Sequence, residues 1–369
     1  MADHRTSLFR STSPGMDARI WCRLPEHLLE HVLSFLPLKA FLSLRSTCKH
    51  FNSLIFSPSF ISKHSSSSSS SDSNLDSFLL LSHPQFRHRY RLFDTKLHKW
   101  RRQSICLSSR LSGLPSATSL VSISRGLLCF STASSFLVCS LLSRSSRIVN
   151  FPETPSPSAF DFITFVSSPN GFSLFMLSPT GAFLYNSRLH HWNRFDRVDS
   201  VLADSYHQEG VFFNGKLYFT TTEPFSIVGF DLETGKWERE TIELPEELTF
   251  VRLMSNGGEK LYLVGGIGQN GISRSLKLWE LSLNWVEVVT VPEMMCRKFM
   301  SVCYHNYEHV YCFWHQGLVC VCCYNWPEIL YYKVSRGTWH WLPKCPALPE
   351  KCSLGFRWFC LIPQLHASV

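Results

Sequence analysis

Tryptophan recurs at a nearly constant interval along most of this 369-residue chain, and this repeat constrains the fold more than any other feature. Each copy has an apolar run, a short polar turn and a segment led by tryptophan, at Trp100, Trp192, Trp237, Trp285 and Trp339. From Trp192 onward the interval ranges from 45 residues (Trp192 to Trp237) to 54 residues (Trp285 to Trp339). A degenerate copy, in which Cys139-Ser140 leads to Ser146, fills the gap after Trp100. This period predicts one four-stranded blade per copy, and therefore a mainly β fold, a six-bladed β-propeller.

The copy around Trp237 shows its four predicted strands most clearly, at about residues 208–213, 216–220, 226–231 and 237–241. Asn214-Gly215 between the first two strands is typical of a tight type I′ hairpin turn. The first copy supplies only three strands, whereas an additional strand at 355–361 is left over at the other end of the chain. We expect this C-terminal strand to complete the first blade and close the ring, which would remove exposed sheet edges.

A helical pattern precedes the repeats, from Leu24 to Pro37. Apolar residues recur at every fourth position with a second row beside them, so the helix has a wide apolar stripe made of Leu24, Leu28, Leu29, Val32, Leu33 and Leu36. Two further short helices are predicted at 38–44 and 47–56. A unit of about forty residues rarely buries enough apolar surface to be stable alone. We therefore interpret the stripe as an interface with another protein.

Composition divides the chain into four predicted parts. Residues 1–18 form a disordered polar leader, 19–61 the three-helix unit, 62–77 a serine-rich linker, and 78–369 the propeller. The linker contains the unbroken run Ser65 to Ser71, which cannot bury apolar area and is expected to act as a flexible tether.

The helical unit resembles an F-box over residues 20–60. The resemblance rests on the spacing of Leu24-Pro25, Leu28-Leu29, Val32-Leu33, Leu36-Pro37, Leu42, Leu44-Arg45, Cys48-Lys49, Phe51, Leu54-Ile55 and Pro58-Ser59-Phe60. Ala40 stands where an acidic residue is common, and Phe51 where tryptophan is common. The resemblance implies docking on the Skp-type adaptor of SCF ubiquitin ligases, and through it on the cullin scaffold. The expected adaptor-facing or supporting residues are Leu24, Pro25, Leu28, Leu29, Val32, Leu33, Leu36, Pro37, Leu38, Leu42 and Leu44.

The repeats resemble the kelch-type propellers that follow F-boxes in plant proteins. The matching phrases are Ser124-Arg125-Gly126-Leu127-Leu128-Cys129, Val211-Phe212-Phe213-Asn214-Gly215-Lys216-Leu217-Tyr218 and Leu263-Val264-Gly265-Gly266. The two resemblances together imply the substrate-recognition subunit of an SCF-type E3 ubiquitin ligase, whose propeller binds a protein substrate for ubiquitination. Such a chain is not an enzyme and needs no cofactor.

Two alternatives remain open at this stage. The first is a propeller-based metalloenzyme such as a copper radical oxidase, for which Tyr304-His305 is the nearest candidate pair of ligands. The second is a non-degradative scaffold that binds the adaptor and only sequesters its client. A metal assay would test the first, and client abundance with and without proteasome inhibition would test the second.

Three short motifs match the patterns of other sites. His27, Glu30 and His31 fit the H-x-x-E-H pattern of zinc proteases, but no third ligand is identifiable. The run from Gly266 to Gly271 fits G-x-G-x-x-G, but a strand is expected after it instead of the required helix, so these glycines are predicted to form turns. Cys312, His315 and the cysteines at 320–323 offer zinc ligands, but a strand would divide them between two faces, which favours packed thiols.

Charge and composition restrict the partners further. A net charge of +8 and a pI of 8.8 amount to a modest basic excess, which gives no independent argument for nucleic acid. The densest basic region, residues 87–102, contains Trp100, which the first blade needs, so we expect a solvated blade edge. Fourteen cysteines, spread through apolar runs, indicate reduced thiols. With no long apolar segment and no signal peptide, we expect a soluble protein of the nucleus or cytoplasm.

Overall fold

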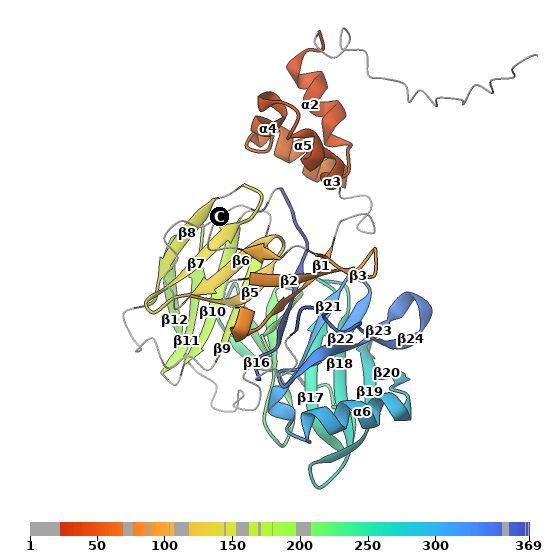
Figure 1. Ribbon diagram of the computed structural model, residues 1–369. Helices are drawn as coiled ribbons and strands as arrows, with labels where there is room; N and C mark the ends of the chain where they lie inside the picture. Colours follow the sequence, from red (N-terminus) through yellow and green to blue (C-terminus); the bar gives the residue numbers. More distant parts are fainter. Residues whose placement is uncertain are drawn as a thin grey trace, which may run out of the picture. The chain divides into compact units, whose positions relative to one another are not determined.

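The computed structural model describes residues 23–68, 77–86, 89–102, 104–106, 118–143, 145–152, 162–168, 171–178, 180–196, 208–348, 354–365, 367 and 369. The chain divides near residue 74 into two compact units, the first helical and the second built of β-sheets (Figure 1). The predicted leader at 1–18, and the part of the predicted linker at 69–76, lie outside the described residues.

Four helices make up the described part of the first unit: α2 (Glu26–Ser34), α3 (Leu38–Leu44), α4 (Lys49–Leu54) and α5 (Pro58–Ser68). Proline precedes both α2 and α3, where its fixed φ suits the start of a helix. The core of the unit is small, and its fully buried side chains are Leu33, Phe41, Leu54, Ile55 and Phe60. The rings of Phe41 and Phe60 lie 4.6 Å apart. Helix α3 has the predicted bounds, and α4 lies within its predicted range.

Helix α5 corrects the prediction of a three-helix unit. It extends to Ser68, so the first residues of the expected linker are helical. Serine is a weak helix former, and the sequence therefore gives little local signal for this helix. Tertiary packing stabilises this helix instead, because α5 packs against α2 and places Phe60 in the core.

The second unit forms six antiparallel sheets in its described residues, which confirms the predicted six blades. Blade 1 contains β1 (Phe78–Ser82), β2 (Arg89–Asp94), β3 (Lys99–Trp100), β4 (Ile105–Cys106) and β25 (Arg357–Leu361). Blade 2 contains β5 (Ser119–Ser124), β6 (Leu127–Ser131), β7 (Ser135–Ser140) and β8 (Ser146–Asn150). Blade 3 contains β9 (Phe162–Ser168), β10 (Gly171–Ser178), β11 (Gly181–Asn186) and β12 (His191–Phe195).

The remaining blades follow the same order along the chain. Blade 4 contains β13 (Val211–Phe213), β14 (Lys216–Thr220), β15 (Ile227–Asp231) and β16 (Trp237–Arg239). Blade 5 contains β17 (Leu248–Ser255), β18 (Leu261–Gln269), β19 (Ile272–Leu281) and β20 (Trp285–Thr290). Blade 6 contains β21 (Val310–His315), β22 (Leu318–Cys323), β23 (Trp326–Lys333) and β24 (Thr338–Trp341).

The C-terminal strand closes the ring, as predicted. Strand β25 pairs antiparallel with β1, in a register that places Phe78 opposite Leu361 and Ser82 opposite Arg357. Strand β25 also contacts β5 and β21, the innermost strands of the two neighbouring blades. Strand β25 therefore joins blade 1, to which it belongs, to blades 2 and 6.

The tryptophan repeat marks the same hairpin in successive blades. Its aromatic partner lies directly opposite on the adjacent strand, as in the pairs Phe93–Trp100, Tyr185–Trp192, Phe230–Trp237 and Tyr332–Trp339. The degenerate copy obeys the same register, because Cys139 faces Ser146. Blade 5 differs, because Trp285 faces Leu281 across a shorter turn, and the ladder has a bulge farther along, at Leu278/Trp279.

Three of these tryptophans also join neighbouring blades. The indole Nε1 of Trp100 donates a hydrogen bond to the carbonyl of Pro343, at 2.8 Å. Trp192 donates to Asn150 at 2.9 Å, and Trp237 donates to Asp196 at 2.8 Å. In each case the acceptor lies at the end of the last strand of the preceding blade or within two residues after it. The repeat is therefore conspicuous in the sequence because it stabilises contacts both within a blade and between blades.

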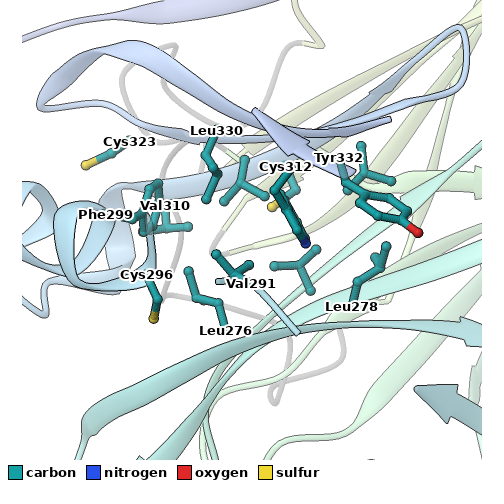
Figure 2. Packing of buried hydrophobic residues seen from close by; sticks show 14 of the residues in the cluster. Leu276, Leu278, Val291, Cys296, Phe299, Val310, Cys312, Cys323, Leu330 and Tyr332 are labelled. Carbon is teal, nitrogen blue, oxygen red and sulfur yellow. The ribbon is translucent and has the colours of Figure 1, made fainter. Parts of the chain in front are cut away.

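One helix, α6 (Glu293–Cys303), lies between blades 5 and 6 in the described chain and packs on β19 and β23 (Figure 1). Its buried side chains are Cys296, Phe299, Met300 and Cys303. They join a core with Leu276 and Val291 from the blade 5 side and with Leu330 from β23 (Figure 2). This helix is absent from the elements expected from the sequence.

The run from Gly266 to Gly271 does not form a dinucleotide-binding loop. The glycine-rich run is a strand and a turn, because β18 continues through Gly268 and β19 begins at Ile272. Among the three glycines of that run, only Gly271 has a turn conformation, with φ 71°, beside Asn270 with φ 52°, so the prediction that all of these glycines form turns is wrong. A side chain at Gly266 would clash with the Ser273 hydroxyl, which explains glycine within the strand.

The cysteine interpretation is confirmed for the described residues. Cys312 and Cys323 lie in the core between blades 5 and 6, and Cys320 and Cys322 lie in the core between blades 6 and 1. All four are buried free thiols. Burial raises the pKa of Cys312 to about 12, so this thiol remains protonated at neutral pH.

Candidate functional site

The exposed face of α2 carries an apolar row that the helical unit does not bury. Leu28 and Val32 are each 42% exposed, and Phe35, just beyond the helix, is 65% exposed. Their spacing of four and three residues places them on one side of the helix. Large apolar residues in a row on a surface are typical of a protein interaction site.

The predicted adaptor residues divide into three groups. Leu29, Leu33 and Leu38 are buried and form part of the core of the unit. The partly buried members are Leu24, Leu36, Leu42 and Leu44, and the exposed members are Pro25, Leu28, Val32 and Pro37. The structure therefore places the first group as support and the third as candidate contacts. Sequence reasoning missed Phe35, although its position seven residues after Leu28 is a helical spacing.

Glu30 fixes the orientation of this face. Its carboxylate accepts hydrogen bonds from Lys63 Nζ at 2.8 Å, Ser59 Oγ at 2.9 Å and Ser57 Oγ at 3.1 Å. The hydrogen bond from Lys63 lowers the pKa of Glu30 below its ordinary value and outweighs the opposing effect of burial. The carboxylate is thus ionised at neutral pH and joins α2 to α5.

The same contacts argue against a zinc site at the H-x-x-E-H motif. Glu30 is committed to Lys63, Ser57 and Ser59, whereas both histidines of the motif are exposed. The ring of His31 packs edge-on against Phe35, with centroids 4.9 Å apart. Among the described residues, no three His, Cys, Asp or Glu side chains are close enough together to hold a metal ion.

A second candidate site is the central channel of the propeller. A cavity of about 340 Å³ is lined by residues of the innermost strands, β5, β9, β17, β21 and β25, and by the segment that enters β13. Apolar side chains such as Leu253, Met254 and Phe313 form part of its wall. The charged residues of the described lining are Arg125, Glu209 and Arg357.

Polar contacts between blades shape the wall of the channel. Gln208 is held from two sides, since its Oε1 accepts from Cys312 N at 3.0 Å and its Nε2 donates to Leu253 O at 3.2 Å. Thr164 Oγ1 accepts from Gly210 N at 2.8 Å, which joins β9 to the entry of β13. These bonds connect the segment that enters β13 to the inner strands of blades 3, 5 and 6, and they make the lining a defined surface.

The pair proposed from the sequence as metal ligands lies outside this channel. Tyr304 is 81% exposed and follows α6, and both Tyr304 and His305 have positive φ values, 51° and 54°. His305 Nδ1 lies 2.8 Å from the Tyr307 hydroxyl. The described lining of the channel contains one tyrosine, Tyr311, whose hydroxyl donates to Phe356 O, and it contains no histidine.

The basic region around Trp100 forms the edge of blade 1. Trp100 packs against Trp358, and Arg101 is paired with Asp94. Lys96 and Lys99 are exposed. This arrangement agrees with the expected solvated blade edge.

None of the described helices is long and apolar enough to span a membrane.

Comparison with known proteins adds three findings. A family model described as the F-box domain matches residues 21–63. An F-box/kelch-repeat protein of Arabidopsis thaliana is 50% identical, over 97% of this chain and 91% of its own. Two other proteins of that organism, F-box only protein 6 and Protein UNUSUAL FLORAL ORGANS, are 26% and 24% identical, over 90% and 91% of this chain and 72% and 81% of their own lengths.

Proposed function

Because the chain belongs to the plant F-box/kelch-repeat family, we propose that it is the substrate-recognition subunit of an SCF-type E3 ubiquitin ligase. The F-box binds a Skp-type adaptor, and through it the cullin scaffold. The propeller binds a protein substrate. The chain contributes proximity to a ubiquitin-conjugating enzyme and performs no bond-making step itself.

The observation that supports adaptor binding is the division of α2 into two apolar faces. One face, with Leu29 and Leu33, is buried in the unit, while Leu28, Val32 and Phe35 remain exposed. Complete burial of an aliphatic or aromatic side chain stabilises an association by roughly 1.5–3 kcal/mol. Since Leu28 and Val32 are already half-buried, each contributes about 1 kcal/mol and Phe35 about 2 kcal/mol on the same scale. Together these contributions are large enough to anchor a partner.

The support from α5 makes this face rigid before binding. Glu30 lies on α2 between Leu28 and Val32, and its bonds to Lys63, Ser59 and Ser57 hold the helix against α5. A preorganised surface loses less conformational entropy on association than a mobile one. The same contacts keep Leu28 and Val32 directed away from the core.

The test is Leu28→Asp in the full chain, with binding to a purified Skp-type adaptor measured by calorimetry. A carboxylate left unpaired in the interface costs about 3 kcal/mol or more, so the affinity should fall by a factor of about 100 or more. Because Leu28 is 42% exposed, the variant should keep the circular dichroism spectrum of the parent protein.

Leu283→Asp is the matched control, because Leu283 is 90% exposed and lies in the propeller. It introduces the same charge and should leave adaptor affinity unchanged. If Leu28→Asp bound the adaptor as tightly as the parent, the exposed face of α2 would not be the docking surface.

A further inference from the structure

The channel of the propeller holds charged groups that the proposed adaptor surface does not use. Arg125 lies in the turn after β5, with φ 42°, and is exposed. Its guanidinium makes no hydrogen bond or ion pair with the residues that the structure describes, although it lines the cavity. An arginine without a partner at the wall of a cavity has all its N–H donors available for a ligand.

Arg357 and Glu209 are positioned by two consecutive residues of β5. Arg357 Nη2 donates to Val121 O at 3.1 Å, and its guanidinium lies 5.1 Å from the centroid of the Phe359 ring. Ser122 Oγ donates to the Glu209 carboxyl at 2.7 Å. No ion pair joins Arg357 to Glu209 in this described part of the channel, so each retains hydrogen-bonding capacity.

The channel has a net positive charge. Burial raises the pKa of Glu209 to about 7, against the opposing effects of the Ser122 hydrogen bond and the charge of Arg357. Glu209 is therefore only partly ionised at neutral pH, whereas the two arginines remain charged. The thiol of Cys129 also interacts with Glu209, and it stays protonated because burial raises its pKa.

A further polar atom in the lining lacks a partner. Gln364 Oε1 is buried and makes no hydrogen bond with the described residues. A buried acceptor in this state marks a position where a ligand can supply a donor. The cavity volume of about 340 Å³ lies at the small end of the range for small-molecule sites, which is roughly 300–1,000 Å³.

We propose that this channel binds a small hydroxylated organic acid. Its carboxylate pairs with the arginines, its hydroxyl donates to Gln364, and its apolar body packs against Leu253, Met254 and Phe313. The volume favours such a molecule over a polypeptide segment. This site is independent of adaptor docking, and it would give the substrate-binding domain a small-molecule ligand.

The test uses three probes of equal shape and different charge: 4-hydroxybenzoate, 4-hydroxybenzamide and 4-hydroxybenzamidine. Binding to the full chain is measured by ligand-observed NMR titration at pH 6 and pH 8. The acid should bind most tightly, and the neutral amide should bind about tenfold more weakly, because it lacks the charge that attracts the arginines. The cationic amidine should show no binding.

Two variants assign the binding to the channel. Arg125→Gln should weaken binding of the acid by about tenfold. Glu209→Gln should have the opposite effect, because the neutral amide oxygen still accepts from Ser122 while the negative charge is lost. In the parent protein the affinity for the acid should fall about three- to tenfold from pH 6 to pH 8, because Glu209 ionises over this range. Glu209→Gln should abolish this pH dependence. Arg297→Gln, exposed on α6 outside the channel, is the control and should change nothing.

Several results would overturn the proposal. They are a preference for the amidine, absence of binding by all three probes, or binding of the acid that neither channel variant changes. Tighter binding of a capped Asp-Tyr dipeptide than of 4-hydroxybenzoate would also overturn it, in favour of a peptide occupant. The opposite signs expected for Arg125→Gln and Glu209→Gln separate a loss of binding from a loss of fold.

Discussion

Replacing Trp237 with phenylalanine tests the idea that the repeated tryptophan joins neighbouring blades. Its indole packs against Phe230, with ring centroids 4.9 Å apart, and against Phe219 at 5.7 Å. Its Nε1 donates to the carbonyl of Asp196, the residue that follows the last strand of blade 3. Phenylalanine retains an aromatic ring at this position and loses the bond between the blades.

The expected cost has two parts. The smaller ring buries about 40 Å² less apolar area, which is worth about 1 kcal/mol. Loss of the hydrogen bond adds about 0.5–1.5 kcal/mol, so the free energy of unfolding should fall by about 1.5–2.5 kcal/mol.

Trp285→Phe supplies the matched control within the same chain. Trp285 likewise begins the last strand of its blade, but its buried Nε1 has no hydrogen-bond partner among the described residues. This substitution should therefore cost only the area contribution, about 1 kcal/mol or less. The two variants should therefore differ by about 0.5–1.5 kcal/mol or more, because Trp237→Phe loses the bond between the blades whereas Trp285→Phe removes a buried N–H that has no partner.

The assay is urea unfolding followed by circular dichroism, which avoids the fluorescence change that loss of a tryptophan would cause. If both variants unfolded at the same urea concentration, the Trp237–Asp196 hydrogen bond would contribute nothing to stability. If Trp285→Phe were the less stable, the reasoning from hydrogen bonding would be wrong.

The remaining predictions concern the α2–α5 contact and the closure of the ring. Glu30→Gln should destabilise the helical unit by about 1–3 kcal/mol at pH 7, measured by thermal unfolding, because the charged hydrogen bond to Lys63 is lost. The pKa of Glu30 is lower in the folded protein than in the unfolded chain, where it is about 4.3. The parent protein should therefore lose this stabilisation as the pH falls from about 4.3 through the lower folded-state pKa, whereas Glu30→Gln should show no such loss. A parent protein with no extra acid sensitivity would contradict this. Deletion of residues 357–369 removes β25 and leaves β1 unpaired along one edge. Limited proteolysis should therefore cut the propeller of this variant rapidly. Resistance equal to that of the full chain would show that closure of the ring is not required.

Local spacing was sufficient to predict most of the β architecture. The distance from Phe230 to Trp237 is that of two residues facing each other across a short turn, and the structure pairs them. Strand β14 has the predicted bounds, residues 216–220. Because a hairpin is determined by a few adjacent residues and by its turn, its sequence contains most of the information that specifies it.

The two missed helices show where such reasoning fails. Helix α5 begins with Pro58 but continues into serines, which have weak helix propensity, and its contacts with Glu30 on α2 compensate. Helix α6 does carry a signal in the sequence, because Pro292 precedes it, and Cys296, Met300 and Cys303 recur at helical spacing.

The sequence alone determined that α2 has a wide apolar stripe and that the chain carries six repeats. It did not determine which part of the stripe is exposed. Leu28 and Leu29 are adjacent in the sequence and lie about 100° apart around the helix, so only the packing of the other helices makes Leu29 core and Leu28 surface. The channel depended still more on tertiary structure. Glu209 and Arg357 are far apart in the sequence, and both line this channel. Arg357 reaches Val121 of β5 from strand β25, which pairs with β1, and Glu209 reaches Ser122 from the segment that enters β13.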